Sequence, residues 1–100
     1  MQPFTKSVIE IIQDIPEGKV MTYGQVARVA GNPRAARQVA RLLHTMSEKH
    51  SLPWHRVVNA KGNIVIKDEA GSDIQRMALE SEGIPVINGK IDLSGYQVEQ

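Results

Sequence analysis

The chain lacks cysteine altogether, and its 100 residues include only one Trp, two Tyr and one Phe. The absence of cysteine excludes disulfides, thiolate metal sites, redox motifs and a thiol nucleophile. No apolar run approaches the length of a membrane span, and residues 1–6 lack the pattern of a signal peptide. The sequence therefore predicts a protein of the cytoplasm that does not enter a membrane.

The composition is that of an ordinary folded protein, with 41% hydrophobic and 23% charged residues. A chain of this length can bury one modest core and is too short for two. We therefore expect a single domain over residues 1–100, with the tail at residues 84–100 less well ordered because it shows no clear period.

Charge is unevenly distributed along the chain, although the formal net charge is only +1. Between Lys19 and Lys67 there are nine basic residues and a single acid, Glu48, which gives +8; outside this window three bases and ten acids give −7. Because attraction depends on local charge, the basic middle predicts a polyanionic partner, with nucleic acid first among the candidates. The alternative is a solvated basic face without a ligand.

Three helices are predicted in the first half of the chain. Apolar residues at helical spacing indicate an amphipathic helix that ends at residues 16–18: Phe4, Val8, Ile11, Ile12 and Ile15. A capping box then opens a second helix, with Thr22 accepting from the first turn and Gln25 reaching back, and Gly31 ends it. Asn32 as N-cap and Pro33 at the first position predict a third helix from Pro33 to about Leu43.

The second and third of these helices resemble a helix-turn-helix joined at Gly31-Asn32. The third would carry arginines on one side and small residues that allow a close approach to DNA: Arg34, Arg37 and Arg41, with Ala35, Ala36 and Ala40. A helical hairpin of this length is weakly specific by itself. Many such hairpins bind nothing.

The second half of the chain predicts a short β-hairpin and one more helix. Val57-Val58, the turn at residues 60–63 and residues 64–66 are typical of a hairpin. Ser72 and Gln75 repeat the capping-box pattern and predict a last helix that ends at Gly83. The expected fold is mainly α: one winged-helix-like domain with a helix-turn-helix and a short β-hairpin.

The most informative segment is Leu52-Pro53-Trp54-His55-Arg56-Val57-Val58. It resembles the Pro-Cys-His-Arg-Val motif of O6-alkylguanine-DNA alkyltransferases, and with Trp at the cysteine position it looks like the alkyltransferase-like proteins. Alkyl transfer needs a strong nucleophile, which thiolate supplies and indole does not. Trp54 instead offers a flat face and one N–H donor, which suit a pocket that receives a base. A core Trp, or one that anchors a partner, is the alternative.

The resemblance extends from about Phe4 to Gly83 and implies a fold like the alkyltransferase C-terminal domain. Residues 19–24 are similar to the family's tyrosine-bearing segment, residues 31–37 to its recognition helix, and Glu82-Gly83 to its acidic motif. The resemblance implies that the recognition helix enters the minor groove, that Tyr23 helps to rotate the phosphate, and that Arg37 fills the gap left by an extruded nucleotide. The alternatives are that Tyr23 is a half-buried aromatic residue at the start of a helix and that Arg37 is an ordinary solvated arginine.

Two sets of site residues follow from this resemblance. The DNA-binding set comprises Thr5, Thr22, Tyr23, Arg34, Ala35, Ala36, Arg37, Ala40 and Arg41. The lesion-pocket set comprises Tyr23, Trp54, His55, Lys67 and Glu82. In true alkyltransferases the residues that match His55 and Glu82 activate the cysteine through a hydrogen-bond chain, so in this chain they are interpreted as structural remnants or pocket supports.

No metal or cofactor is predicted. The three histidines, His44, His50 and His55, are too loosely spaced to form a zinc site without cysteine ligands or an evident carboxylate partner.

Two departures from the family pattern affect the pocket. The alkyltransferases close it with a Gly-Gly-Tyr-x-Gly-Gly loop, whereas this chain has residues 65–71, Val-Ile-Lys-Asp-Glu-Ala-Gly. The pocket should therefore close differently, and similarity to the Trp-bearing relatives implies that Lys67 reaches the altered base. Met46 stands where the family has a hinge asparagine, so the loop before Trp54 must be held in another way.

The predicted function is a monomeric, non-enzymatic damage sensor that binds O6-alkylguanine in duplex DNA by nucleotide flipping and flags it for nucleotide excision repair. A transcriptional or architectural DNA-binding module is the main rival, and it leaves the motif around Trp54 unexplained. An enzyme that uses His55 and Glu82 for hydrolysis or base excision is a second rival, and it lacks an evident nucleophile or electrophile.

Overall fold

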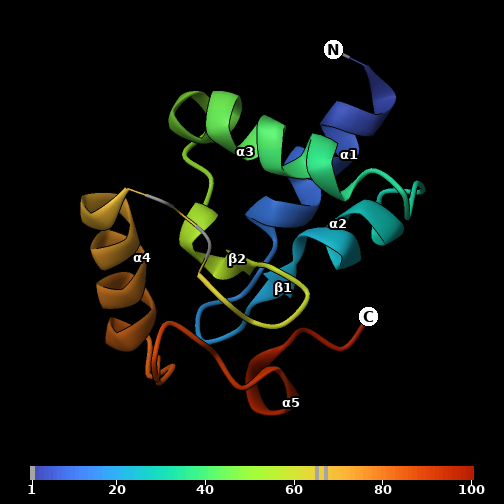
Figure 1. The fold of residues 1–100 in the computed structure, drawn as a ribbon. Helices are drawn as coiled ribbons and strands as arrows, with labels where there is room; N and C mark the ends of the chain where they lie inside the picture. Colours follow the sequence, from blue (N-terminus) through green and yellow to red (C-terminus); the bar gives the residue numbers. More distant parts are fainter. Residues whose placement is uncertain (1, 65, 67) are drawn as a thin grey trace.

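The computed structural model describes residues 2–64, 66 and 68–100, and it is mainly α-helical (Figure 1). Its elements in chain order are α1 (Pro3–Gln13), β1 (Met21–Thr22), α2 (Tyr23–Val29), α3 (Ala36–His50), the 3₁₀ helix η1 (Trp54–Arg56), β2 (Val57–Val58), α4 (Glu69–Ser81) and α5 (Leu93–Tyr96). Within this described part of the chain, no helix is long and apolar enough to cross a membrane.

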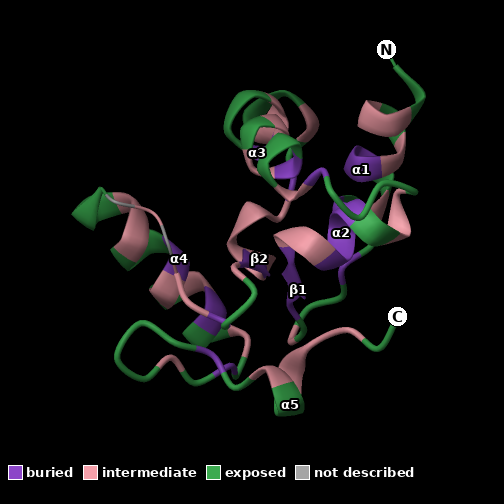
Figure 2. Cartoon of the chain, turned by 45° about the vertical axis from the view of Figure 1, so that its right-hand side comes forward, coloured by how far each residue is buried: buried purple, intermediate pink, exposed green. Residues whose placement is uncertain are grey.

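Two clusters of buried side chains form the core. The larger lies between α1, α2 and α3, which pack on one another, and it includes Val8, Ile12, Val26, Val39 and Leu43. The smaller joins β1 and β2 to α4 and the carboxyl-terminal tail, and it consists of Val20, Val58, Leu79, Ile84 and Ile91. Figure 2 shows buried residues on α1, α2 and α3 and along the two strands that lie between these clusters.

The sheet differs from the predicted hairpin. Val57 and Val58 pair in parallel with Met21 and Thr22, which are about 36 residues away in the sequence. The predicted turn does form, because Asn59 Oδ1 accepts from the amides of Lys61 and Asn63. Ile64, at the start of the predicted second strand, donates its amide to the Gly89 carbonyl instead. Val65, the centre of that strand, lies outside the described residues.

The capping box that opens α2 is confirmed. The Gln25 amide donates to Thr22 Oγ1 at 3.0 Å, and the Thr22 amide donates to Gln25 Oε1 at 3.4 Å. Because this box needs only two residues three apart, it forms from local sequence.

The predicted start of the third helix is wrong. The helix begins at Ala36 rather than Pro33, since Asn32 Oδ1 accepts from the Arg34 amide and its carbonyl accepts from the Ala35 amide, which makes residues 32–35 a turn. Arg34 therefore precedes α3 instead of lying on it. The helix also runs past Leu43 to His50 and ends where Ser51 adopts a left-handed conformation.

The last predicted helix starts one turn early. Asp68 caps α4 by accepting from the Gly71 amide, so Ser72 lies within the helix and Gln75 is buried rather than capping. Gly83 ends it as predicted: its φ of +83° suits glycine, and the Ile84 amide donates back to the Leu79 carbonyl.

The carboxyl-terminal tail is packed, contrary to the expectation that residues 84–100 are less well ordered. The Val20 amide donates to the Tyr96 carbonyl, and the Val98 amide donates to the Val20 carbonyl. Gln25 Nε2 donates to the Val98 carbonyl at 2.6 Å. Its apolar side chains contact both core clusters, because Ile84 and Ile91 are buried in the smaller one and Val98 packs against the larger one.

Candidate nucleic-acid interface

Trp54 lies at the start of η1 and forms one wall of a pocket of about 360 Å³. The lining residues come from five separate segments: Tyr23, Ala40, Leu43, His44, Ser47, Trp54, Ile66 and Gln75. Tyr23 directly follows β1 and Trp54 lies just before β2, so the parallel pairing of these strands sets the two aromatic side chains in one pocket. The pocket therefore unites two residues that the sequence placed in the lesion-pocket set.

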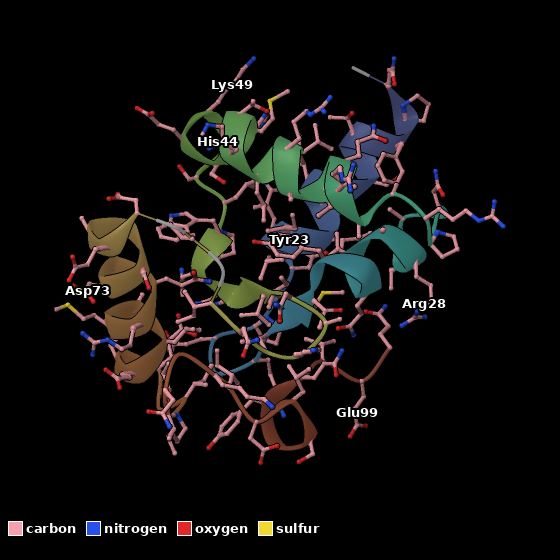
Figure 3. All side chains as sticks on the ribbon, in the orientation of Figure 1. Tyr23, Arg28, His44, Lys49, Asp73 and Glu99 are labelled. Atoms are coloured by element: carbon pink, nitrogen blue, oxygen red, sulfur yellow. The ribbon has the colours of Figure 1, made fainter. Side chains whose placement is uncertain are left out.

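Tyr23 is partly buried, and this burial raises the pKa of its hydroxyl above the ordinary value of 10.0. The phenol is therefore protonated at physiological pH and can donate a hydrogen bond. Figure 3 shows Tyr23 below α3. A phenol in this place can contact a base or phosphate that approaches from the α3 side.

His55 and Glu82 do not line the pocket. They belong to a cluster of mostly buried polar side chains between η1, which includes His55, and the end of α4, where Glu82 lies; His55 Nε2 and Glu82 Oε2 are 2.6 Å apart. Arg56 donates to both Glu82 oxygens, with Nη2 at 2.9 Å from Oε2, and its Nη1 donates to the Ile15 carbonyl. The Gly18 amide completes the set by donating to Glu82 Oε1 at 2.9 Å.

This cluster strongly favours the ionised form of Glu82. Burial alone would raise the pKa of the carboxyl, but the hydrogen bonds from Arg56, Gly18 and His55 outweigh it and lower the pKa to about 2. The carboxylate ties α4 to η1 and to the loop after α1. The carboxylate therefore fixes the segment that carries Trp54, and its role as a pocket support stays a prediction. Sequence reasoning missed Arg56, although it stands within the motif.

Gln75 is a second residue that sequence reasoning missed as part of the site. It is only 2% exposed, and its Nε2 donates to the carbonyls of His55 and Val57, both at 3.1 Å. These two bonds fix the orientation of the amide, because a flipped amide would place its oxygen against two carbonyl oxygens, which cannot donate to it. Gln75 Oε1 has no partner among the described residues.

The proposed DNA-binding residues are distributed over α1, β1, α2, the turn before α3 and α3 itself, and they differ in exposure. Arg34, Arg37 and Arg41 are exposed, and the last two are one helical turn apart on α3. Thr5, Ala36 and Ala40 are partly exposed. By contrast, Ala35 and Thr22 are buried, and Thr22 Oγ1 accepts from the Gln25 amide as the cap of α2. Lys67 lies outside the described residues.

Among the side chains that the structure describes, no three His, Asp or Glu residues gather as metal ligands. His44 lines the pocket, His50 is at the end of α3, and His55 belongs to the Glu82 cluster.

Comparison with known proteins identifies the family. Residues 3–84 match the model of the 6-O-methylguanine DNA methyltransferase, DNA binding domain. The chain is 50% identical over 97 residues to the DNA base-flipping protein of Escherichia coli strain K12, covering 94% of this chain and 73% of that protein. It is 40% identical over 87 residues to alkyltransferase-like protein 1 of Schizosaccharomyces pombe, covering 86% of this chain and 81% of that protein.

Solved structures agree with these matches. The S. pombe protein in complex with damaged DNA containing O6-carboxymethylguanine superimposes with a TM-score of 0.89 at 36% identity, covering 100% of this chain and 98% of that one. The O6-methylguanine methyltransferase of Mycobacterium tuberculosis gives a TM-score of 0.65 at 28% identity over 82% of this chain and 49% of that one. With its Trp54 motif and its lack of cysteine, the chain belongs to the alkyltransferase-like, base-flipping group of the methyltransferase DNA-binding-domain family.

Proposed function

We propose that this protein binds O6-alkylguanine in duplex DNA by rotating the base out of the helix and into the Trp54 pocket. The observation that carries the proposal is the pocket itself, which has an aromatic wall and opens beside a helix with exposed arginines. An O6-alkyl group weakens base pairing and so lowers the cost of extrusion, and its apolar atoms gain burial beside Trp54.

The protein is then a sensor rather than an enzyme. We infer that it acts as a monomer in the cytoplasm, that Arg37 occupies the vacated stack, and that the bound, flipped site is a flag for nucleotide excision repair. The two relatives named for base flipping and alkyltransferase likeness support the DNA-binding part of this proposal.

The decisive experiment compares matched duplexes with and without one O6-methylguanine. We expect tighter binding to the lesion. Binding that follows sequence and ignores the lesion would favour a transcriptional or architectural role, whereas release of a base or alkyl group would favour an enzyme.

Incubation with lesion-bearing DNA is expected to leave both partners covalently unchanged, because the chain has no thiol to accept an alkyl group. Intact-protein mass spectrometry tests this expectation. A protein that gains the mass of one methyl group would contradict the sensor model.

Arg34→Ala is expected to weaken binding to lesioned and undamaged duplexes by similar factors, because Arg34 is exposed in the turn before α3 and is placed to contact the phosphate backbone. Loss of one phosphate contact should reduce the slope of log K against log salt by about one unit. Titrations at several salt concentrations measure it. Selective loss of lesion binding would show that Arg34 reads the damaged site instead.

A further inference from the structure

The α3 wall of the pocket is a single stripe of the helix. Ala40, Leu43, His44 and Ser47 recur at the spacing of one helical face, and all four line the pocket. Ala40 follows Arg37 by one turn, and Ser47 lies about 10 Å further along the axis. A base that enters beside Arg37 therefore has the length of this stripe beside it for a substituent.

The polar groups on the pocket walls differ from one side to the other. On the α4 side, both Nε2 hydrogens of Gln75 are used by backbone carbonyls, which leaves Oε1, an acceptor, as its unpartnered atom in the described structure. On the α3 side, Ser47 donates its hydroxyl proton to the Leu43 carbonyl. His44 is exposed, and its ring is free to point a donor at a ligand.

No acidic side chain lines the pocket in the described part of the chain. The residues that face His44 across it are Tyr23 from α2, Trp54 from η1 and Gln75 from α4, all without formal charge. On α3 itself, Arg41 precedes His44 by one turn and Glu48 follows it by one turn. The pocket thus has one ionisable nitrogen base, His44, among its lining residues.

We propose that His44 determines specificity by favouring O6-alkyl groups that end in a carboxylate. This proposal rests on the proposed function and names a class of lesion for the same pocket. A carboxylate would be directed to α3, because both Nε2 hydrogens of Gln75, on the α4 side, are already donated to backbone carbonyls and are not available to bind it. The His44 imidazole would then donate a hydrogen bond to the carboxylate, which is charge-assisted because the acceptor is ionised.

The exposure of His44 makes this interaction feasible. A carboxylate at the open side of the pocket keeps part of its hydration and avoids the full desolvation cost of a buried ion. For the same reason the gain is modest. An exposed contact of this kind is expected to change relative affinity by about three- to fivefold.

The test uses two lesions of similar length in the same duplex, O6-carboxymethylguanine and O6-(2-hydroxyethyl)guanine, which differ in charge. Dissociation constants are measured for the wild type, for His44→Gln and for Lys49→Gln. Lys49 is the matched control, because it is a basic residue near His44 on α3 that does not line the pocket and extends outward from the helix (Figure 3). We expect His44→Gln to reduce the preference for the carboxymethyl lesion about three- to fivefold and Lys49→Gln to leave it unchanged.

A lesion preference that His44→Gln leaves intact would overturn the proposal. An equal decrease in Lys49→Gln would also overturn it, because the effect would then come from the general positive field of α3. Binding of O6-methylguanine over guanine by the wild type is measured in parallel. If that discrimination is present while the His44 effect is absent, only the specificity assignment fails; if it is absent, the proposed function itself fails.

Discussion

Replacing Glu82 by alanine is expected to destabilise the protein by about 3 kcal/mol, the largest effect of any single change considered for this chain. The Glu82 side chain is only 8% exposed, and its removal would leave Arg56 and His55 mostly buried without their common partner. Breaking a buried ion pair from one side costs more than the pair contributes, because the remaining charge stays desolvated. Urea unfolding followed by circular dichroism measures the loss.

Glu80→Ala is the matched control for this change. Glu80 is also an acid on α4, but it is 42% exposed and pairs with Arg76 one turn away on the same helix. Exposed pairs of this kind contribute less than about 1 kcal/mol. If both variants lose the same stability, the Glu82 cluster has no special structural role.

The same carboxylate predicts how stability depends on pH. Its pKa is lowered in the folded state, to about 2 from 4.5, so its contribution is fully present above pH 4.5 and is lost as pH falls toward 2. The wild type should therefore lose stability over this interval more steeply than Glu82→Ala. Parallel slopes for the two proteins would mean that Glu82 is not the group that titrates.

Trp54→Ala and Arg37→Ala are each expected to weaken binding to a lesion-bearing duplex by about 1–3 kcal/mol, with a smaller effect on intact duplex. Trp54 supplies an aromatic wall of the pocket, and loss of a stacking surface for a base has a cost of this size. Arg37 is exposed on α3 and is proposed to fill the vacated stack, so its loss should be comparable. Competition titrations with both duplexes measure the two losses.

A fluorescent base analogue placed opposite or beside the lesion separates the two roles. Arg37→Ala should suppress extrusion and reduce the signal, whereas Trp54→Ala should permit extrusion but hold the base loosely. Arg34→Ala serves as the control, since it should weaken both duplexes alike. Normal extrusion by Arg37→Ala would make α3 a plain DNA anchor and strengthen the regulatory alternative.

Local sequence patterns predicted the structure correctly where residues that are close together in the sequence determine it. The Thr22–Gln25 box and the glycine at residue 83 need only nearby backbone groups, and both formed as expected. The start of α3 failed because Asn32 has two local options, a helix cap and a turn, and the turn formed. The predicted hairpin failed because Val57 and Val58 found a distant partner strand, which periodicity does not reveal.

The site residues show the same difference between local and long-range determinants. Trp54 and Tyr23 were identified from their motifs, and the structure brings both to one pocket. Gln75 and Arg56 were missed, because the value of each depends on buried partners contributed by other elements. A glutamine within a helix gives no sign in the sequence that its amide will hold two carbonyls of another segment.

The parallel pairing of β1 with β2 makes the pocket depend on residues that are far apart in the sequence, whereas the proposed DNA-binding surface depends on residues that are close together. The surface that would hold DNA is built from α2 and α3, which are neighbours in sequence and can associate through local contacts. The pocket exists only when residues 21–22 meet residues 57–58, which requires closure of a loop of more than thirty residues. Transient opening of this short pairing would preserve the basic surface of α3 but disassemble the pocket. Such a state could still slide along DNA, and it could not bind an extruded base.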